Sequence, residues 1–253
     1  MPARLPFDRI ATIYDETRGL PPKLNARLLH VLVEELHGKR VLEVGVGTGR
    51  FAVPLQKGGV SVVGIDISHE MVALGRAKGL RDVVYADGAR LPFASGSFDV
   101  AMTNHVLHLL PDWRDVLLEV AGVTRESFST IIERMEMDAD LQKEYHRLAE
   151  AEGYSWRAPG LHERDLPKVL PPDLVMPVGP FVDVVPASAV LSELEARAYS
   201  SLWEAPEEVH RKVIAALRAQ WAGREIRRSL GADVCFWRID RLAELARQGP
   251  PMS

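Results

Sequence analysis

The sequence predicts a doubly wound α/β fold with a mainly parallel sheet, a helical cap and a C-terminal antiparallel strand pair. Three observations lead to this prediction. Short β-branched runs alternate with helical segments through the first half of the chain, a rhythm typical of right-handed βαβ crossovers. The first run ends in a glycine-rich turn, RVLEVGVGTGR, at residues 40–50. The second half is mostly helical and contains two further β-rich stretches.

Apolar spacing and local signals predict the elements of the first half. Leucines at helical spacing indicate a helix that ends near Gly38. Ser68 is a predicted helix N-cap, and Pro111 or Asp112 begins a later helix. In order, we expect a helix at 24–36, a strand at 40–44, a helix from residue 51, a strand at 61–66, a helix at 68–79, strands at 82–87 and 98–106, and a helix at 111–122.

The pattern changes beyond Gly122. A charged segment at 133–152 has a helical apolar spacing, and Pro171 and Pro172 end a short helix that follows a loop. Two more helices are expected at 192–203 and 206–221. We therefore expect one domain, 1–253, made of an N-terminal lid and helix (1–36), a ligand-binding core (37–132), a helical cap (133–178 and 188–230) and strands that complete the sheet (179–187 and 231–240).

The composition is that of a globular protein with a sizeable core. Of 253 residues, 47% are hydrophobic and 26% charged, and the formal net charge of −4 makes a nucleic-acid partner unlikely. No apolar run reaches transmembrane length, so we expect a cytoplasmic monomer or homodimer without membrane insertion. The single cysteine, Cys235, excludes an internal disulfide and is expected to be a buried thiol.

Three kinds of ligand compete for the glycine turn. The dinucleotide fingerprint G-x-G-x-x-G needs a glycine where Arg50 stands, and a P-loop needs a lysine after Gly49. The chain instead reads E-x-G-x-G-x-G from Glu43. In this motif it resembles the class I S-adenosylmethionine (SAM) dependent methyltransferases, in particular the small-molecule group typified by quinone-biosynthesis enzymes. The resemblance extends over about residues 7–120 and includes FASGSFDVAMTNHVLHLLPDW at 93–113.

The resemblance implies SAM as the methyl donor and S-adenosylhomocysteine (SAH) as the product. Asp66 ends the second predicted strand, about 20 residues after Gly45, where a carboxylate reaches the ribose hydroxyls of an adenosine ligand. Ile67 and Met71 would contact the adenine, and Asp87 would lie by its amino group. The implied cofactor-binding residues are Tyr14, Arg18, Glu43, Gly45, Val46, Gly47, Thr48, Gly49, Asp66, Ile67, Met71, Asp87, Gly88, Ala89, Asn104 and His105.

Methyl transfer from a sulfonium needs mainly proximity and in-line positioning, and a general base only when the acceptor must lose a proton. His105 and His108 flank the end of the fourth strand, and His162 lies in the expected cap. These histidines are the candidate bases, each with a plain packing role as the alternative. Tyr14 is a further catalytic candidate, and with Arg18 it suits a lid over the SAM carboxylate. No metal is expected, because no Cys/His cluster has ligand spacing.

The chain departs from the family after the fourth strand. The usual Pro-Gly-Gly turn before a fifth strand is absent, and only residues 127–132, SFSTII, have β-like composition. Three explanations are open: a degenerate fifth strand, a lost strand, or residues that are omitted or disordered around 121–132. The last is favoured, because a missing neighbour would leave the fourth strand unpaired.

The expected function is SAM-dependent methylation of a small-molecule acceptor. The alternative is a catalytically inactive SAM- or SAH-binding sensor or partner module, which the altered fifth strand and the lack of an assigned base motivate. A nicotinamide oxidoreductase is a distant third, because Arg50 breaks the dinucleotide fingerprint.

Overall fold

The computed structural model describes residues 20–248 and is built on one seven-stranded sheet. The strands are β1 Arg40–Val44, β2 Ser61–Asp66, β3 Val83–Tyr85, β4 Phe98–Thr103, β5 Thr124–Met137, β6 Leu174–Pro186 and β7 Glu225–Arg238. Their order is β3-β2-β1-β4-β5-β7-β6. Strands β1 to β5 pair in parallel, whereas β7 pairs antiparallel with both β5 and β6. The predicted fold class is confirmed.

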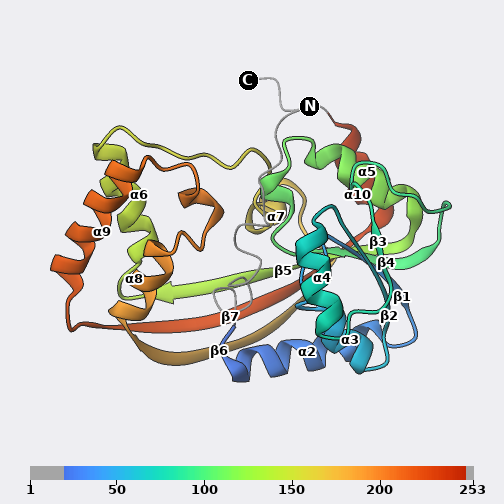
Figure 1. Cartoon of the computed structure of the whole chain (residues 1–253). Helices are drawn as coiled ribbons and strands as arrows, with labels where there is room; N and C mark the ends of the chain where they lie inside the picture. Colours follow the sequence, from blue (N-terminus) through green and yellow to red (C-terminus); the bar gives the residue numbers. More distant parts are fainter. Residues whose placement is uncertain (1–19, 249–253) are drawn as a thin grey trace.

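Helices cover both faces of the sheet (Figure 1). They are α2 Pro22–Leu36, α3 Ala52–Lys57, α4 His69–Ala77, α5 Trp113–Val123, α6 Leu141–Ala151, α7 Leu166–Val169, α8 Ala187–Glu195, α9 Glu207–Trp221 and α10 Ile239–Arg247, with short 3-10 turns η2 Leu107–Leu109, η3 Glu163–Asp165 and η4 Ser200–Leu202. None of the helices between residues 20 and 248 is both long and apolar enough to cross a membrane.

Two hydrophobic cores lie on opposite faces of the sheet. On one face, Leu28 and Leu32 of α2 belong to a buried cluster that includes Val41 of β1. On the other face, α5 and α10 cover Phe128 and Trp237, whose ring centroids are 6.0 Å apart. Burial of this apolar area is the main favourable term in the stability of the fold.

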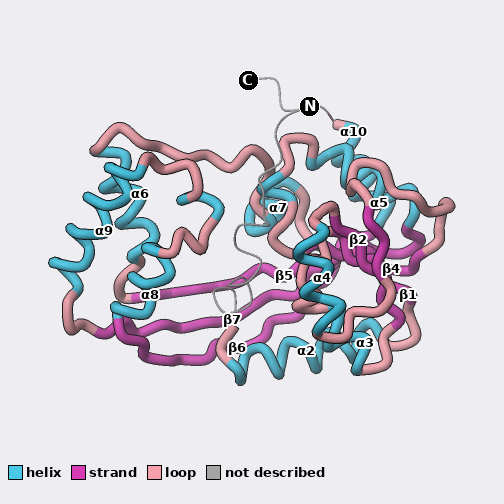
Figure 2. The backbone as a smooth tube through the Cα atoms, in the orientation of Figure 1, coloured by secondary structure: helices cyan, strands magenta, loops and turns pink. Residues whose placement is uncertain are grey.

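A third hydrophobic core lies apart from the parallel strands. Helices α6, α8 and α9 pack around Tyr145, Leu194 and Leu217; we call these three helices with η4 the helical lobe. Figures 1 and 2 show the lobe at the far end of β5, β7 and β6, which run well beyond the parallel part of the sheet. The lobe falls within the residues expected to form the cap.

The fifth strand is present, so the expectation of omitted or disordered residues around 121–132 is wrong. Helix α5 ends at Val123, and Thr124 already has the extended dihedrals φ −110° and ψ 145°. No Pro-Gly-Gly turn is needed, because the chain passes from helix to strand within one residue. The segment SFSTII lies inside the 14-residue β5 and is largely buried.

The strand also continues past the predicted boundary at 132. Residues 133–137 were expected to begin a helix, but they pair with β7 from Glu133–Ala232 to Met137–Arg228. Cross-strand pairing overrides the helix propensity of Glu, Arg and Met. The helix α6 begins only after Asp140, whose side chain accepts a hydrogen bond from the backbone N–H of Lys143 at 3.0 Å.

The other boundary predictions in the second half were wrong in the same direction. Strands β6 and β7 begin at Leu174 and Glu225 rather than at 179 and 231. The added residues of β6 pair with β7 near the parallel strands, from Leu174–Phe236 to Val178–Ala232, whereas the added residues of β7 pair with the end of β6 beside the helical lobe. Residues 239 and 240 belong to α10, an amphipathic helix that the sequence reading did not predict. In the first half, the predicted strand at 98–106 ends at Thr103, because the chain turns away from the sheet there.

Candidate functional site

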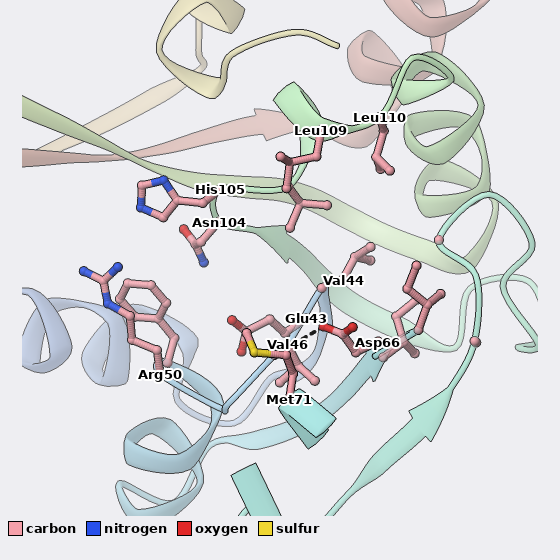
Figure 3. A pocket seen from close by; sticks show the side chains of 18 residues that line it. Glu43, Val44, Val46, Arg50, Asp66, Met71, Asn104, His105, Leu109 and Leu110 are labelled. Atoms are coloured by element: carbon pink, nitrogen blue, oxygen red, sulfur yellow. Dashed lines mark hydrogen bonds between the residues drawn. The ribbon is translucent and has the colours of Figure 1, made fainter. Parts of the chain in front are cut away.

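One pocket lies at the carboxyl ends of β1, β2 and β4, where open α/β sheets bind ligands. Figure 3 shows Arg50, Asn104 and His105 at one end of it, with Asp66 and Leu110 toward the other. The lining residues are Glu43, Val44, Gly45, Val46, Gly47, Arg50, Phe51, Ile65, Asp66, Ile67, Met71, Ala86, Gly88, Asn104, His105, Val106, Leu109 and Leu110.

The glycine turn after β1 is held close to β2. The backbone N–H groups of Gly45 and Val46 both donate to the Ile65 carbonyl at 2.9 Å. Gly45 has φ 73°, and a Cβ there would lie 2.4 Å from Cγ2 of Val106. The Val106 side chain therefore occupies the space next to Gly45 where a Cβ would lie. At Gly47, with φ 51°, a Cβ would meet only Met71 Cε, at 3.1 Å, and Asp66 Oδ2, at 4.0 Å, both on the pocket wall.

Asp66 is fixed by the turn that it faces. Its Oδ2 accepts a hydrogen bond from the Gly47 N–H and its Oδ1 from the Ser68 N–H, both at 2.8 Å. A carboxylate oxygen can accept more than one hydrogen bond. The half-buried Asp66 can therefore accept hydrogen bonds from a ligand without giving up those that orient it.

Three buried polar atoms at one end of the pocket have no hydrogen bond of good geometry to the described residues: Glu43 Oε2, Arg50 Nη1 and Asn104 Nδ2. Burial raises the pKa of Glu43 to about 8, against opposing effects of the Ala52 N–H, Arg50 and Asn104; Asp66 adds to the rise. The Asn104 amide nevertheless lies close enough to Glu43 for a weak side-chain hydrogen bond, which partly opposes this rise in pKa. The Asn104 Oδ1 accepts from the Ile131 N–H at 3.2 Å, which directs the amide nitrogen the other way. A buried polar group without a partner costs free energy. This end of the pocket is therefore suited to bind a ligand group that carries both a positive and a negative charge.

His105 follows β4 and lies at the same end of the pocket. Its backbone φ of 58° is in the left-handed region, which non-glycine residues seldom adopt and which often marks a functional site. Its Nε2 lies 3.2 Å from Oε1 of Glu133 on β5. The same carboxylate oxygen lies 3.5 Å from Arg50 Nη2.

The other two candidate histidines lie together, away from the lining of the pocket. His108 and His162 stack with centroids 5.0 Å apart and an interplanar angle of 8°. Directly after His162 the chain carries a buried carboxylate, Glu163, whose Oε1 accepts from the N–H groups of Val106 and Leu107 at 2.5 and 2.9 Å. Sequence reasoning missed Glu163, since no local pattern shows that its partners lie more than 50 residues away.

The Glu163 carboxylate stays ionised despite its burial. Burial raises the pKa, but the hydrogen bond and charge of His108, with the charge of His105, outweigh it and lower the pKa of Glu163 to about 2. His108 Nδ1 lies 3.3 Å from Glu163 Oε2. Burial, with the neighbouring His108 and Arg164, lowers the pKa of His162. This arrangement holds the turn after β4 rather than a ligand.

The structure brings most of the predicted cofactor residues together. Ten of them line the pocket: Glu43, Gly45, Val46, Gly47, Asp66, Ile67, Met71, Gly88, Asn104 and His105. Four others do not: Thr48, Gly49, Asp87 and Ala89. Asp87 accepts a hydrogen bond from the Ala89 N–H at 2.9 Å, which forms a local turn instead. Tyr14 and Arg18 lie outside the described residues. The sequence reading used Arg50 only to exclude the dinucleotide fingerprint. Its position directly after the glycine turn is the signal that could have placed it in the pocket lining.

Comparison with known proteins bears on this pocket directly. Residues 42–128 match a family model described as a methyltransferase domain. Over this segment the chain is similar to a methyltransferase domain. The segment runs from β1 into β5 and contains most of the pocket lining, whereas the helical lobe lies outside it. This similarity supports the expected cofactor, SAM.

Curated relatives share mainly the methyltransferase domain. An uncharacterized protein of Methanocaldococcus jannaschii is 32% identical over 139 residues, which are 55% of this chain and 65% of that protein. A demethylmenaquinone methyltransferase of Corynebacterium glutamicum is 39% identical over 88 residues, 35% of this chain and 38% of that protein. The chain thus spans less than two thirds of either relative.

The fold extends further than the sequence similarity. The solved structure of a SAM-dependent methyltransferase from Thermotoga maritima matches 91% of this chain and 97% of its own, with a TM-score of 0.52 and 18% identity. At this identity the likeness shows the fold alone. Within residues 20–248, no group of three or more His, Cys, Asp or Glu side chains is arranged to hold a metal ion.

Proposed function

We propose that this protein transfers the methyl group of SAM to a small-molecule acceptor. The observation that carries the proposal is the set of unpartnered buried atoms on Glu43, Arg50 and Asn104. SAM has an ammonium and a carboxylate at its amino-acid end. The Glu43 carboxylate would accept from the ammonium, while Arg50 and Asn104 would donate to the carboxylate.

The rest of the pocket fits the nucleoside part of the same molecule. Asp66, held by two backbone N–H groups, would accept hydrogen bonds from the ribose hydroxyls. Ile67, Met71 and Leu110 supply apolar surface for the adenine.

Bound SAM supplies an electrophilic methyl group on a sulfonium that is already a good leaving group. The protein's contribution is then to bind, orient and exclude water. A bound geometry close to the in-line arrangement accounts for much of the acceleration in such reactions. The polar end of the pocket, where Asn104 and His105 lie, is the side on which the acceptor would approach (Figure 3).

A small acceptor suits the part of the chain outside the methyltransferase domain. The net charge of −4 provides no general attraction for nucleic acid. The helical lobe and the strands that carry it would determine which acceptor binds, since function varies on such folds through the parts added to the core. Similarity to the demethylmenaquinone enzyme is limited to 35% of this chain and leaves the acceptor open.

Calorimetric titration with SAH tests the cofactor half of the proposal. We expect micromolar binding that Asp66→Ala abolishes, whereas Asp82→Ala, a change in an exposed aspartate before β3, leaves it intact. Transfer of label from methyl-tritiated SAM to small acceptors tests the reaction. Absence of SAH binding in a folded protein rejects the proposal.

The alternative of a catalytically inactive SAM-binding module has lost its main support. It was motivated by an altered fifth strand and by the lack of an assigned base. The strand β5 is complete and pairs on both sides, and His105 lies at the pocket with a carboxylate partner. We therefore do not propose it.

A further inference from the structure

His105 lines the pocket and contacts Glu133 of β5, and the exposed Met135 lies two residues further along the same strand. We propose that His105 is the general base for an acceptor hydroxyl, that Glu133 positions and balances it, and that Met135 supports an apolar acceptor body. This inference rests on the proposed function and adds the class of substrate: an amphipathic molecule that carries a phenolic or similar hydroxyl.

The first step concerns which nitrogen of His105 is available. Nε2 faces Glu133 Oε1 at 3.2 Å. A carboxylate can only accept, so Nε2 carries the proton and Nδ1 carries the lone pair. The His105 side chain is one-third exposed and lines the pocket, so Nδ1 can receive a proton from a molecule that enters beside it.

The second step concerns charge. Proton transfer to Nδ1 makes an imidazolium, which the Glu133 carboxylate stabilises directly. Within residues 20–248, the charged groups around His105 are Glu133 and Arg50, in contact through one carboxylate oxygen, and the more distant Glu163. Two carboxylates and one guanidinium surround the ring, so a positive charge on it is balanced.

The third step concerns the surface beyond the histidine. Glu133 and Met135 are two residues apart on β5 and therefore share one face of the sheet. Met135 pairs with Leu230, which pairs with Phe181, so an apolar row crosses three strands on that face. The Met135 side chain is 50% exposed although its cross-strand neighbour Leu230 is buried. An exposed methionine beside a polar reactive group suits an acceptor with an apolar body.

The reaction balances with these groups. An oxygen lone pair of the acceptor forms the new bond to the methyl carbon, while the carbon–sulfur bond breaks and its electron pair stays on sulfur. The hydroxyl proton moves to His105 Nδ1 and then to solvent. The products are a methyl ether, SAH and one proton.

The test uses the full-length protein, methyl-tritiated SAM and aryl acceptors in matched sets. The probes are 1-naphthol and 4-phenylphenol, with the corresponding aryl amines and methyl ethers as comparisons. We expect label in the phenols and none in the ethers. SAH binding without transfer to any phenol would overturn the inference and leave the proposed function standing, whereas loss of SAH binding would reject both.

Variants separate a base from a packing residue. His105→Asn keeps a residue that tolerates φ 58°; we expect kcat to fall about 100-fold, with the Kd for SAH within twofold. Glu133→Gln should move the acid limb of the pH profile of kcat/KM to lower pH by about one unit. The matched control is Glu34→Gln, in the exposed His30–Glu34 pair of α2 at 3.3 Å, which should change nothing.

Acceptor binding has its own variants. Met135→Ala should raise KM for the phenol several-fold with unchanged SAH binding, whereas Val182→Ala, at an exposed apolar residue of the outer strand β6, should not. An unchanged kcat in His105→Asn, or a loss of SAH affinity without a loss of kcat, would show that His105 is a cofactor contact and overturn the inference.

Discussion

Glu43 should lose its proton when the cofactor binds. Its pKa of about 8 in the free pocket means that about 90% of the carboxyl groups are protonated at pH 7. A ligand ammonium next to the carboxyl favours the ionised form. We therefore expect release of about 0.9 proton per SAH bound at pH 7, falling toward zero at pH 9.

Calorimetry in two buffers measures this release. Phosphate and Tris differ in ionisation enthalpy, so the difference between the observed binding enthalpies gives the number of protons exchanged. Glu43→Gln keeps the shape of the side chain but cannot ionise. Any proton that the ligand amine exchanges on binding is exchanged with both proteins, so the difference between them measures the proton released by Glu43. Equal proton release by the wild type and Glu43→Gln would refute the reasoning.

The same group predicts a pH dependence of stability without ligand. Because the pKa of Glu43 is raised from 4.5 to about 8 on folding, the folded state binds the proton more tightly than the unfolded state does. Its contribution to stability is therefore greatest below pH 4.5 and falls as the pH rises to 8, by about 3 kcal/mol at pH 7. Urea denaturation of the wild type and Glu43→Gln at pH 5, 7 and 8 checks this, and a difference that does not change with pH contradicts it.

Four further outcomes are expected. Asp66→Asn should weaken SAH binding by about 10- to 100-fold in calorimetry. The amide has a single oxygen, so it cannot replace both carboxylate oxygens that accept from the Gly47 and Ser68 N–H groups. An affinity within twofold of wild type would argue against a role of Asp66 in cofactor binding. Gly45→Ala should lower the free energy of unfolding, measured by urea denaturation, by about 2 kcal/mol. The added Cβ would lie 2.4 Å from a Val106 methyl, and the backbone φ of 73° disfavours alanine. An unchanged urea midpoint would show that the turn can adjust. Glu163→Gln should lower the free energy of unfolding by about 2 kcal/mol in the same assay. The substitution replaces a buried carboxylate, which accepts from the Val106 and Leu107 N–H groups, with an uncharged amide. Burial lowers the pKa of His210, whose Nδ1 lies 2.8 Å from the Tyr145 hydroxyl. The contribution of His210 to stability is therefore complete above about pH 6.5 and falls as the pH drops below that value. Thermal unfolding at pH 5 and 7 should show this fall in the wild type and a smaller one in His210→Gln.

The cofactor side of the fold could be predicted because its signals are local. The spacing of Glu43, Gly45, Gly47 and Gly49 and the position of Asp66 depend only on strand, turn and strand following one another in the chain. All of these except Gly49 line the pocket. Short βαβ units bring such residues to one edge of the sheet whatever the rest of the chain does.

The acceptor side could not be predicted because its contacts are distant in sequence. Glu133 meets His105 only through the pairing of β4 with β5, and Glu163 reaches Val106 from 57 residues away. Residues 133–137 have helix-forming side chains, and only β7 makes them a strand. No window of the sequence contains both partners, so pattern reading identified His105 but neither of the two carboxylates.

The helical lobe has a hydrophobic core of its own, and this separation has a consequence for how specificity can change. Its buried side chains do not belong to the clusters on either face of the parallel sheet. Substitutions inside the lobe should therefore leave the packing around the pocket unchanged. If the lobe determines the choice of acceptor as proposed, repacking of α6, α8 and α9 is the engineering route that this architecture favours, because Glu163 and β6, which lie between α6 and α8 in the chain, stay in place.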